Sequence, residues 1–259
     1  MMDLPKILSD SLAMFRENPK IVLPRLITTM LYAVIMLYLV QASLILKETE
    51  ITPIQARDFF VKMAFILAST IILYILDVYT YAMYPQLAKD YKKGLQVSLV
   101  KALKKVLAKT KTLIGFSIIL FSILGISTII FTSLITLAYT LASTFILSLI
   151  ILVSLIALLA AAILLFFIIP VAVIDDAGLK TAASKGFRLS MENKKPLLKL
   201  NLFFLLLLLA TSTILYLTEF EGALAAITII VFAASRLLQA VVYTYICIAN
   251  PIAYLSLEK

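Results

Sequence analysis

The sequence predicts an all-α polytopic membrane protein with six transmembrane helices and three further helices at the membrane interface. Two observations lead to this fold class. Hydrophobic residues make up 63% of the chain and charged residues 14%, and the mean hydropathy is +1.09. This composition is typical of multi-pass membrane proteins. The stretch from Thr112 to Ile174 contains no Asp, Glu, Lys, Arg or His. Because one crossing needs roughly 20 apolar residues, this stretch holds two.

The remaining apolar runs complete the set of spans. Six spans are expected, at residues 25–46, 53–84, two within 112–174, 197–217 and 223–248. Each pair of spans is preceded by a segment whose apolar residues follow helical spacing, at residues 3–18, 99–111 and 179–191. These three segments carry polar residues on their other faces, and we therefore expect them to be amphipathic helices lying along the interface.

The distribution of Lys and Arg predicts the orientation. Most basic residues lie in the N-terminal segment, after the second span and after the fourth span. The loop after the third span has none, and the loop after the fifth has only acidic residues. Since basic loops stay on the cytoplasmic side, both termini are expected to be cytoplasmic in a protein of the cell membrane.

The same order of elements occurs three times. Residues 3–90, 94–176 and 178–257 each contain a surface helix, a polar break, two spans and a proline near the end of the second span. These prolines are Pro85, Pro170 and Pro251. Alternation of charged and neutral loops is expected of any six-span protein, but it does not account for three surface helices and three matched prolines. We therefore predict one membrane domain built from three helix-span-span repeats.

Two short motifs carry a resemblance to a known group. The run Pro170-Val-Ala-Val-Ile-Asp-Asp-Ala-Gly178 is followed by Ser184-Lys-Gly-Phe-Arg-Leu-Ser190. This pattern resembles a broad group of uncharacterised multi-pass proteins that includes the membrane domains attached to some glycerophosphodiester phosphodiesterases. The resemblance implies a six-span membrane domain. It does not extend to phosphodiesterase activity, because the chain has no His and no acidic cluster suited to binding a metal.

Two charges are expected at membrane depth, Asp77 in the second span and Arg236 in the sixth. Tyr74 and Tyr81 share a helical face with Asp77, and Gln239 and Tyr243 share one with Arg236. A charge inside the membrane is costly, so these residues should face protein or water. Two interpretations are open. If the charges are functional, these residues form a polar seam or a shallow aqueous cavity. If they are structural, each charge neutralises a neighbour and fixes the packing of the helices. Asp77 is the first candidate partner of Arg236, although their heights differ by about 10 Å.

The most basic segment suggests contact with anionic lipid headgroups. The lysines expected to make this contact share one surface helix: Lys101, Lys104, Lys105 and Lys109. Nucleic acid is not expected as a partner, because the helix lacks the interleaved aromatic residues that stack on bases. Membrane lipids at the cytoplasmic face are the expected partners. No cofactor is expected, since the chain has no glycine-rich phosphate loop and no His.

The function remains open between three classes. The first is a non-enzymatic scaffold or lipid-organising membrane protein. The alternative is a transporter or lipid-moving protein that uses the polar seam around Asp77 and Arg236. An intramembrane enzyme ranks last, because no acidic residue or tyrosine has a matched base. A closed, dry bundle would favour the scaffold, whereas a polar cavity lined by Asp77, Tyr81 and Arg236 would favour the transporter.

Overall fold

The structure is a computed structural model that describes residues 2–45, 52–140, 144–216 and 225–257. Within these ranges the chain forms helices and no strand. The helices are α1 (Leu4–Glu17), η1 (Pro19–Val22), α2 (Leu23–Ile45), α3 (Pro53–Lys92), α4 (Leu99–Ala108), α5 (Thr110–Thr140), α6 (Thr144–Leu165), α7 (Ile168–Ile174), α8 (Leu179–Glu192), α9 (Lys194–Tyr216) and α10 (Ala225–Leu257). The expected all-α class is confirmed.

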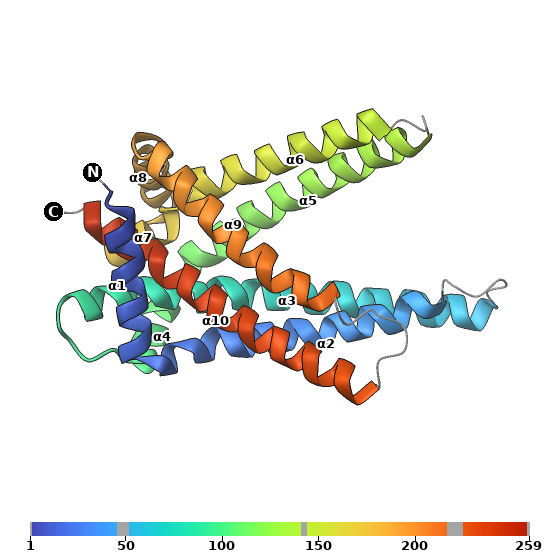
Figure 1. The fold of residues 1–259 in the computed structure, drawn as a ribbon, viewed down its shortest axis with the longest axis horizontal. Coiled ribbons are helices and arrows are strands. Elements are labelled where there is room, and N and C mark those ends of the chain that lie inside the picture. The colour runs from blue at the N-terminus through green and yellow to red at the C-terminus, as the bar shows by residue number, and fades with distance from the viewer. Residues whose placement is uncertain (1, 46–51, 141–143, 217–224, 258–259) are drawn as a thin grey trace.

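The short helices gather at one end of the molecule. Figure 1 shows α1, α4, α7 and α8 at this end, together with both termini, while the long helices extend away from it. The α5–α6 hairpin diverges from the α2–α3 hairpin; α9 lies between the two hairpins in this view, and α10 crosses the α2–α3 hairpin (Figure 1). α10 contacts α1, α2, α3 and α9, and therefore ties the two ends of the chain together.

Within the described ranges, five helices are long and apolar enough to cross a membrane. They comprise Pro19–Leu39, Pro53–Lys92, Thr110–Leu137, Thr144–Ile174 and Ile230–Leu257. The fifth expected span, at residues 197–217, corresponds to α9, which is not among them. Its first two turns carry Lys194, Lys195 and Lys199, and these charges lower the hydropathy of the helix at that end.

The three segments expected to form surface helices are helical, and each buries one face. α1 buries Ile7, Ser11 and Met14; α4 buries Ala102 and Val106. α8 buries three small residues, Ala182, Gly186 and Ser190. A Cβ atom on Gly186 would lie 2.9 Å from the backbone N and Cα of Ile168. Glycine at this position therefore lets α8 approach the backbone of α7 directly.

The matched prolines do not all end helices, contrary to expectation. Pro85 lies inside α3 and Pro251 inside α10. Only near Pro170 does the helix break, between α6 and α7. A proline cannot donate to the carbonyl four residues earlier, which here belongs to Phe166. That oxygen instead accepts a hydrogen bond of 2.6 Å from Nδ2 of Asn250 on α10.

The end of α3 is a glycine cap rather than a proline stop. Gly94 has φ of +66°, the left-handed conformation that glycine adopts without strain. Its N–H donates to the Tyr91 carbonyl at 3.0 Å, and the N–H of Leu95 donates to the Asp90 carbonyl at 2.9 Å. These two bonds form a Schellman motif, which satisfies carbonyls at the helix end.

The buried core lies at the end that carries the short helices. Its largest fully buried side chains include Tyr84, Phe167 and Tyr254, from α3, from just before α7 and from α10. The distant halves of the long helices expose apolar side chains instead; Ile129 is 68% exposed and Ile156 58%. Exposed apolar helices of this length are what a bilayer, rather than water, would cover.

Candidate functional site

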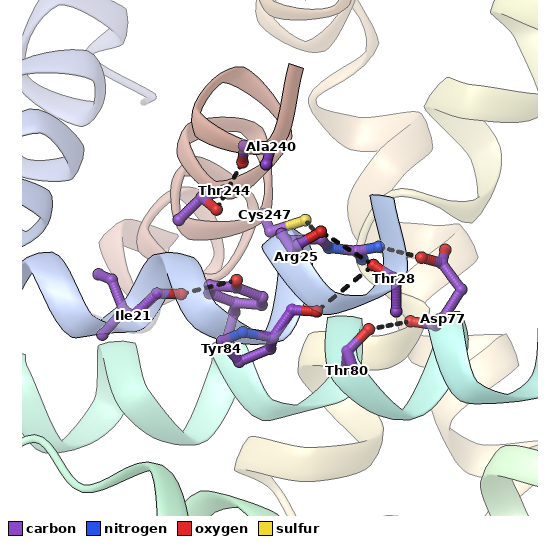
Figure 2. A network of polar contacts seen from close by, with 10 residues as sticks. Ile21, Arg25, Thr28, Asp77, Thr80, Tyr84, Ala240, Thr244 and Cys247 are labelled. Atoms are coloured by element: carbon purple, nitrogen blue, oxygen red, sulfur yellow. Dashed lines mark hydrogen bonds and ion pairs between the residues drawn. The ribbon is translucent and has the colours of Figure 1, made fainter. Parts of the chain in front are cut away.

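A buried ion pair joins the first two long helices. Arg25, in the first turn of α2, lies against the carboxylate of Asp77, in the middle of α3. The Arg25 side chain is 8% exposed and that of Asp77 33%. Nε of Arg25 also lies 3.1 Å from Sγ of Cys247 on α10. Figure 2 shows the guanidinium between these two partners, so that one side chain connects three helices.

Further polar contacts hold α3 against α2 and the residues before it. The guanidinium of Arg25 lies 5.4 Å from the ring centroid of Tyr81. The Tyr84 hydroxyl donates to the Ile21 carbonyl at 2.9 Å, which links α3 to the residues before α2 (Figure 2). The Thr28 hydroxyl donates to the Arg25 carbonyl at 3.2 Å. The backbone that carries Arg25 is therefore fixed on both sides of the residue.

On one side of the ion pair lies a cavity of about 510 Å³, here named cavity 1. Its apolar wall is formed by leucines and other apolar side chains of α5, α6 and α9, among them Leu120, Leu155, Leu158, Leu159, Ala162, Leu205 and Leu208. Its polar residues are Arg25, Tyr74, Asp77, Tyr81, Asn201 and Asn250. Among the described residues, the Tyr74 hydroxyl and Oδ1 of Asn250 are buried without a hydrogen-bond partner.

A second cavity of about 430 Å³, named cavity 2, shares the ion pair as part of its lining. It lies between α2, α3 and α10, and its lining residues are mostly polar: Arg25, Thr28, Thr29, Tyr32, Asp77, Tyr81, Arg236, Gln239, Tyr243, Ile246 and Cys247. Two arginines and one aspartate line it. Its lining therefore carries one excess positive charge.

The expected pairing of Asp77 with Arg236 is wrong. Asp77 pairs with Arg25 instead, and Nη1 of Arg236 donates to Oε1 of Gln239 at 2.9 Å. The guanidinium of Arg236 also lies 4.9 Å from the ring centroid of Phe232. Both contacts are made within α10. Asp77 and Arg236 lie at different heights along their helices, which makes a direct bond between them marginal. Arg25 lies nearer to Asp77 and pairs with it instead.

The predicted seam residues do come together around the cavities. Asp77 and Tyr81 line both cavities, and Tyr74 lines cavity 1. The remaining three, Arg236, Gln239 and Tyr243, line cavity 2. Arg25 was missed, because it falls at the expected start of a span, where arginine is common. Its signal was the buried polar face that it shares with Thr28 and Thr29 at helical spacing.

Three of the four lysines predicted to contact headgroups have acidic partners within the protein. Nζ of Lys101 lies 3.0 Å from Asp90, while Nζ of Lys105 and of Lys109 lie 2.8 and 2.9 Å from Asp176. The hydrogen bonds from Lys105 and Lys109 lower the pKa of Asp176 to about 2. The fourth, Lys104, is exposed.

The cavities are the candidate site of this protein. Over the described ranges, no group of three or more His, Cys, Asp or Glu residues is placed to hold a metal ion. No family model, curated protein or solved structure matches the chain. The candidate function therefore depends on the geometry of the two cavities and of the ion pair between them.

Proposed function

We propose that this protein binds an amphipathic lipid in cavity 1 and moves it between the bilayer and the polar residues around Arg25 and Asp77 inside the protein. The observation that carries the proposal is the composition of that cavity, which has leucines on three helices and a polar end at Arg25 and Asp77. Its volume of about 510 Å³ falls within the range of small-molecule sites. A scaffold that binds no ligand is less favoured, because a scaffold can be a closed bundle and has no need of such a cavity.

The shape of the site matches the two parts of a lipid. An acyl chain would pack against the leucines of α5, α6 and α9, where burial of apolar surface stabilises it. The polar group that joins the chain to the headgroup would lie where Tyr74 and Asn250 hold polar atoms without partners. A buried polar atom without a partner costs free energy, and a ligand that hydrogen-bonds it removes that cost.

The route of entry would be from the bilayer. Leu155 and Leu158 of α6 line cavity 1 and are nevertheless 47% and 52% exposed. Because these side chains face both the cavity and the surroundings, a lipid chain can reach the cavity beside α6 without crossing water. Entry from the side requires no aqueous channel, and the path ends at the ion pair.

The two cavities would lie within a framework of three repeats and six spans. In this framework α9 crosses the membrane in addition to the five long apolar helices, and both termini are cytoplasmic. Each short helix contacts the proline-bearing helix of the preceding unit: α4 contacts α3, α8 contacts α7, and α1 contacts α10. The contacts therefore form a closed ring, as expected of three units arranged around one axis. The exposed Lys104 on α4 would face anionic headgroups on the cytoplasmic side.

Matched ion pairs support the repeat. Asp90 and Asp175 each lie five residues after the proline of their unit. Asp90 pairs with Lys101 of α4, and Asp175 pairs with Lys185 of α8. Each of these lysines directly precedes a buried small residue at the centre of its helix. In the third interface the equivalent positions hold Ser256 and Asp10, which cannot form such a pair.

Matched helix ends give a second, independent support. The side-chain amide of Asn18 donates to the Met14 carbonyl at 3.3 Å, and that of Asn193 to the Leu189 carbonyl at 2.9 Å. In both cases the backbone N–H of the asparagine donates to the same carbonyl. The helices α1 and α8 thus end in the same pattern of hydrogen bonds.

The test is the amount of lipid that remains bound to purified protein. Ala162 lines cavity 1, and Ala160 of the same helix is exposed and does not line it. Ala162→Phe should narrow the cavity and reduce the amount of tightly bound lipid, measured by mass spectrometry, by about tenfold. Ala160→Phe, the matched control, should leave it unchanged. Equal lipid content in the two variants would contradict the proposal.

A further inference from the structure

We propose that cavity 2 binds an oxyanion, a phosphate or carboxylate group, and that Arg236 is its principal ligand. This inference rests on the proposed function in one respect only: it assigns the anion, in the first instance, to the headgroup of the lipid whose chain lies in cavity 1. The two cavities share Arg25, Asp77, Tyr81 and Ile246 in their linings, so that the two parts of one ligand would meet there.

The charge balance of cavity 2 is the first argument. The positive charge of Arg25 is matched directly by Asp77. Among the described residues, no acidic side chain lies within ion-pair distance of Arg236, which makes a hydrogen bond to a neutral amide and a contact with the Phe232 ring. An arginine at membrane depth is costly without an opposing charge. An anion in the cavity would supply that charge.

The hydrogen-bonding capacity of the lining is the second argument. Nε of Arg236 is buried and donates no hydrogen bond to any described residue. Gln239 is 5% exposed, and its carbonyl oxygen already accepts from Arg236. Gln239 also has the NH₂ group of its amide, a donor that it can offer a ligand. Both residues therefore present donors, which an oxyanion accepts and a cation cannot use.

The position of the hydroxyl groups is the third argument. Tyr243 lies on α10 four residues after Gln239 and lines the same cavity, and Tyr32 of α2 lines it as well. A phenolic hydroxyl can donate to a phosphate oxygen, and guanidinium N–H groups bind such oxygens in pairs. Arginine, amide and hydroxyl donors around one cavity form a site for an oxyanion. The single carboxylate in the lining is engaged by Arg25.

The experiment uses the purified full chain in a neutral detergent and three probes. Dodecyl phosphate carries the chain and the anion, dodecanol carries the same chain without a charge, and inorganic phosphate carries the anion alone. We expect the wild-type protein to bind dodecyl phosphate about tenfold more tightly than dodecanol. Tight binding of inorganic phosphate, unaffected by Ala162→Phe, would support the site and identify a free anion as its ligand. Weak binding of inorganic phosphate would assign the anion to the lipid.

The variants assign the preference to Arg236. Arg236→Met should reduce the preference for dodecyl phosphate over dodecanol to less than about threefold, and Arg236→Lys should retain part of it. Arg188→Met is the matched control, because Arg188 lies on the surface of α8 and its side chain is 70% exposed. This control should keep the full preference. Should Arg236→Met fail to fold, the wild-type comparison of the two alkyl probes still tests the anion site, and Arg236→Lys, with a reduced preference, tests the role of Arg236.

The outcomes separate the inference from the proposed function. Equal affinity for dodecyl phosphate and dodecanol, with both lost in Ala162→Phe, would overturn the anion site and leave the lipid site intact. Failure of both alkyl probes to bind, with inorganic phosphate still bound through Arg236, would overturn the lipid site and support the anion site. An unchanged preference in Arg236→Met would overturn the role of Arg236.

Discussion

Removal of either partner of the Arg25–Asp77 pair is expected to destabilise the protein, and removal of both to restore much of the loss. Breaking a buried ion pair from one side costs about 3–5 kcal/mol. The side chains here are 8% and 33% exposed, so solvent reduces that cost for the charge left behind. Asp77→Asn leaves the more deeply buried Arg25 without its carboxylate and should cost about 2–3 kcal/mol. Arg25→Met leaves the more exposed Asp77 and should cost about 1–2 kcal/mol.

The double variant Arg25→Met/Asp77→Asn contains neither charge, and its stability should lie within about 1 kcal/mol of wild type. Reversible unfolding in mixed micelles gives the coupling energy of the pair, which is the sum of the two single losses minus the loss in the double variant and is expected at about 2–5 kcal/mol. The control cycle uses Arg188 and Glu192, an exposed pair on α8 whose N–O distance is 3.9 Å. Its coupling should be less than about 0.5 kcal/mol. Additive single effects at Arg25 and Asp77 would refute the reasoning.

Three further predictions concern α7, α8 and the topology. Gly186→Ala should destabilise the protein by about 1–3 kcal/mol in the same assay, because its Cβ would lie 2.9 Å from the backbone of Ile168. Gly125→Ala, whose Cβ would meet nothing within 4 Å, is the control, and equal losses would contradict the packing of α8 on α7. The pKa of Asp176 falls from its usual 3.8 to about 2, so its stabilising contribution is complete above about pH 4 and is lost as pH decreases toward 2. The difference in melting temperature between wild type and Asp176→Asn should accordingly be constant near neutral pH and shrink below pH 4. A difference that grows as the pH decreases would contradict a stabilising role of the Asp176 carboxylate. In intact cells, cysteines replacing Lys104 and Lys259 should be shielded from an impermeant thiol reagent and one replacing Glu221 labelled; labelling at Lys259 would indicate that α9 does not cross the membrane.

The helices could be predicted from the sequence because membrane helices depend mainly on local composition. A run such as Thr112–Ile174 has no stable alternative to helices in a bilayer, and α5, α6 and α7 occupy it. The expected ends at Pro85 and Pro251 were wrong for a tertiary reason. Neighbouring helices bury both prolines within α3 and α10, and packing there outweighs one lost backbone hydrogen bond.

The candidate site could be predicted in its residues but not in its pairing. Asp77, Tyr81 and Arg236 were identified because polar side chains are rare in such spans, and all three line cavity 2. The partner of Asp77 depends on how α2 is rotated against α3, which local sequence does not specify. Cavity 1 was beyond prediction, since it results from the divergence of the two hairpins and the side-chain volumes between them. The predicted resemblance to the phosphodiesterase-associated membrane domains stays a prediction.

An experimental structure of the full chain in lipid nanodiscs tests the central claim most directly. The account predicts elongated density within cavity 1, running between Leu158 of α6 and Leu208 of α9 and ending beside Arg25 and Asp77. The same density should be absent from Ala162→Phe protein prepared in the same way. A cavity filled by the protein's own side chains, with lipid confined to the outer surface of the helices, would contradict the account.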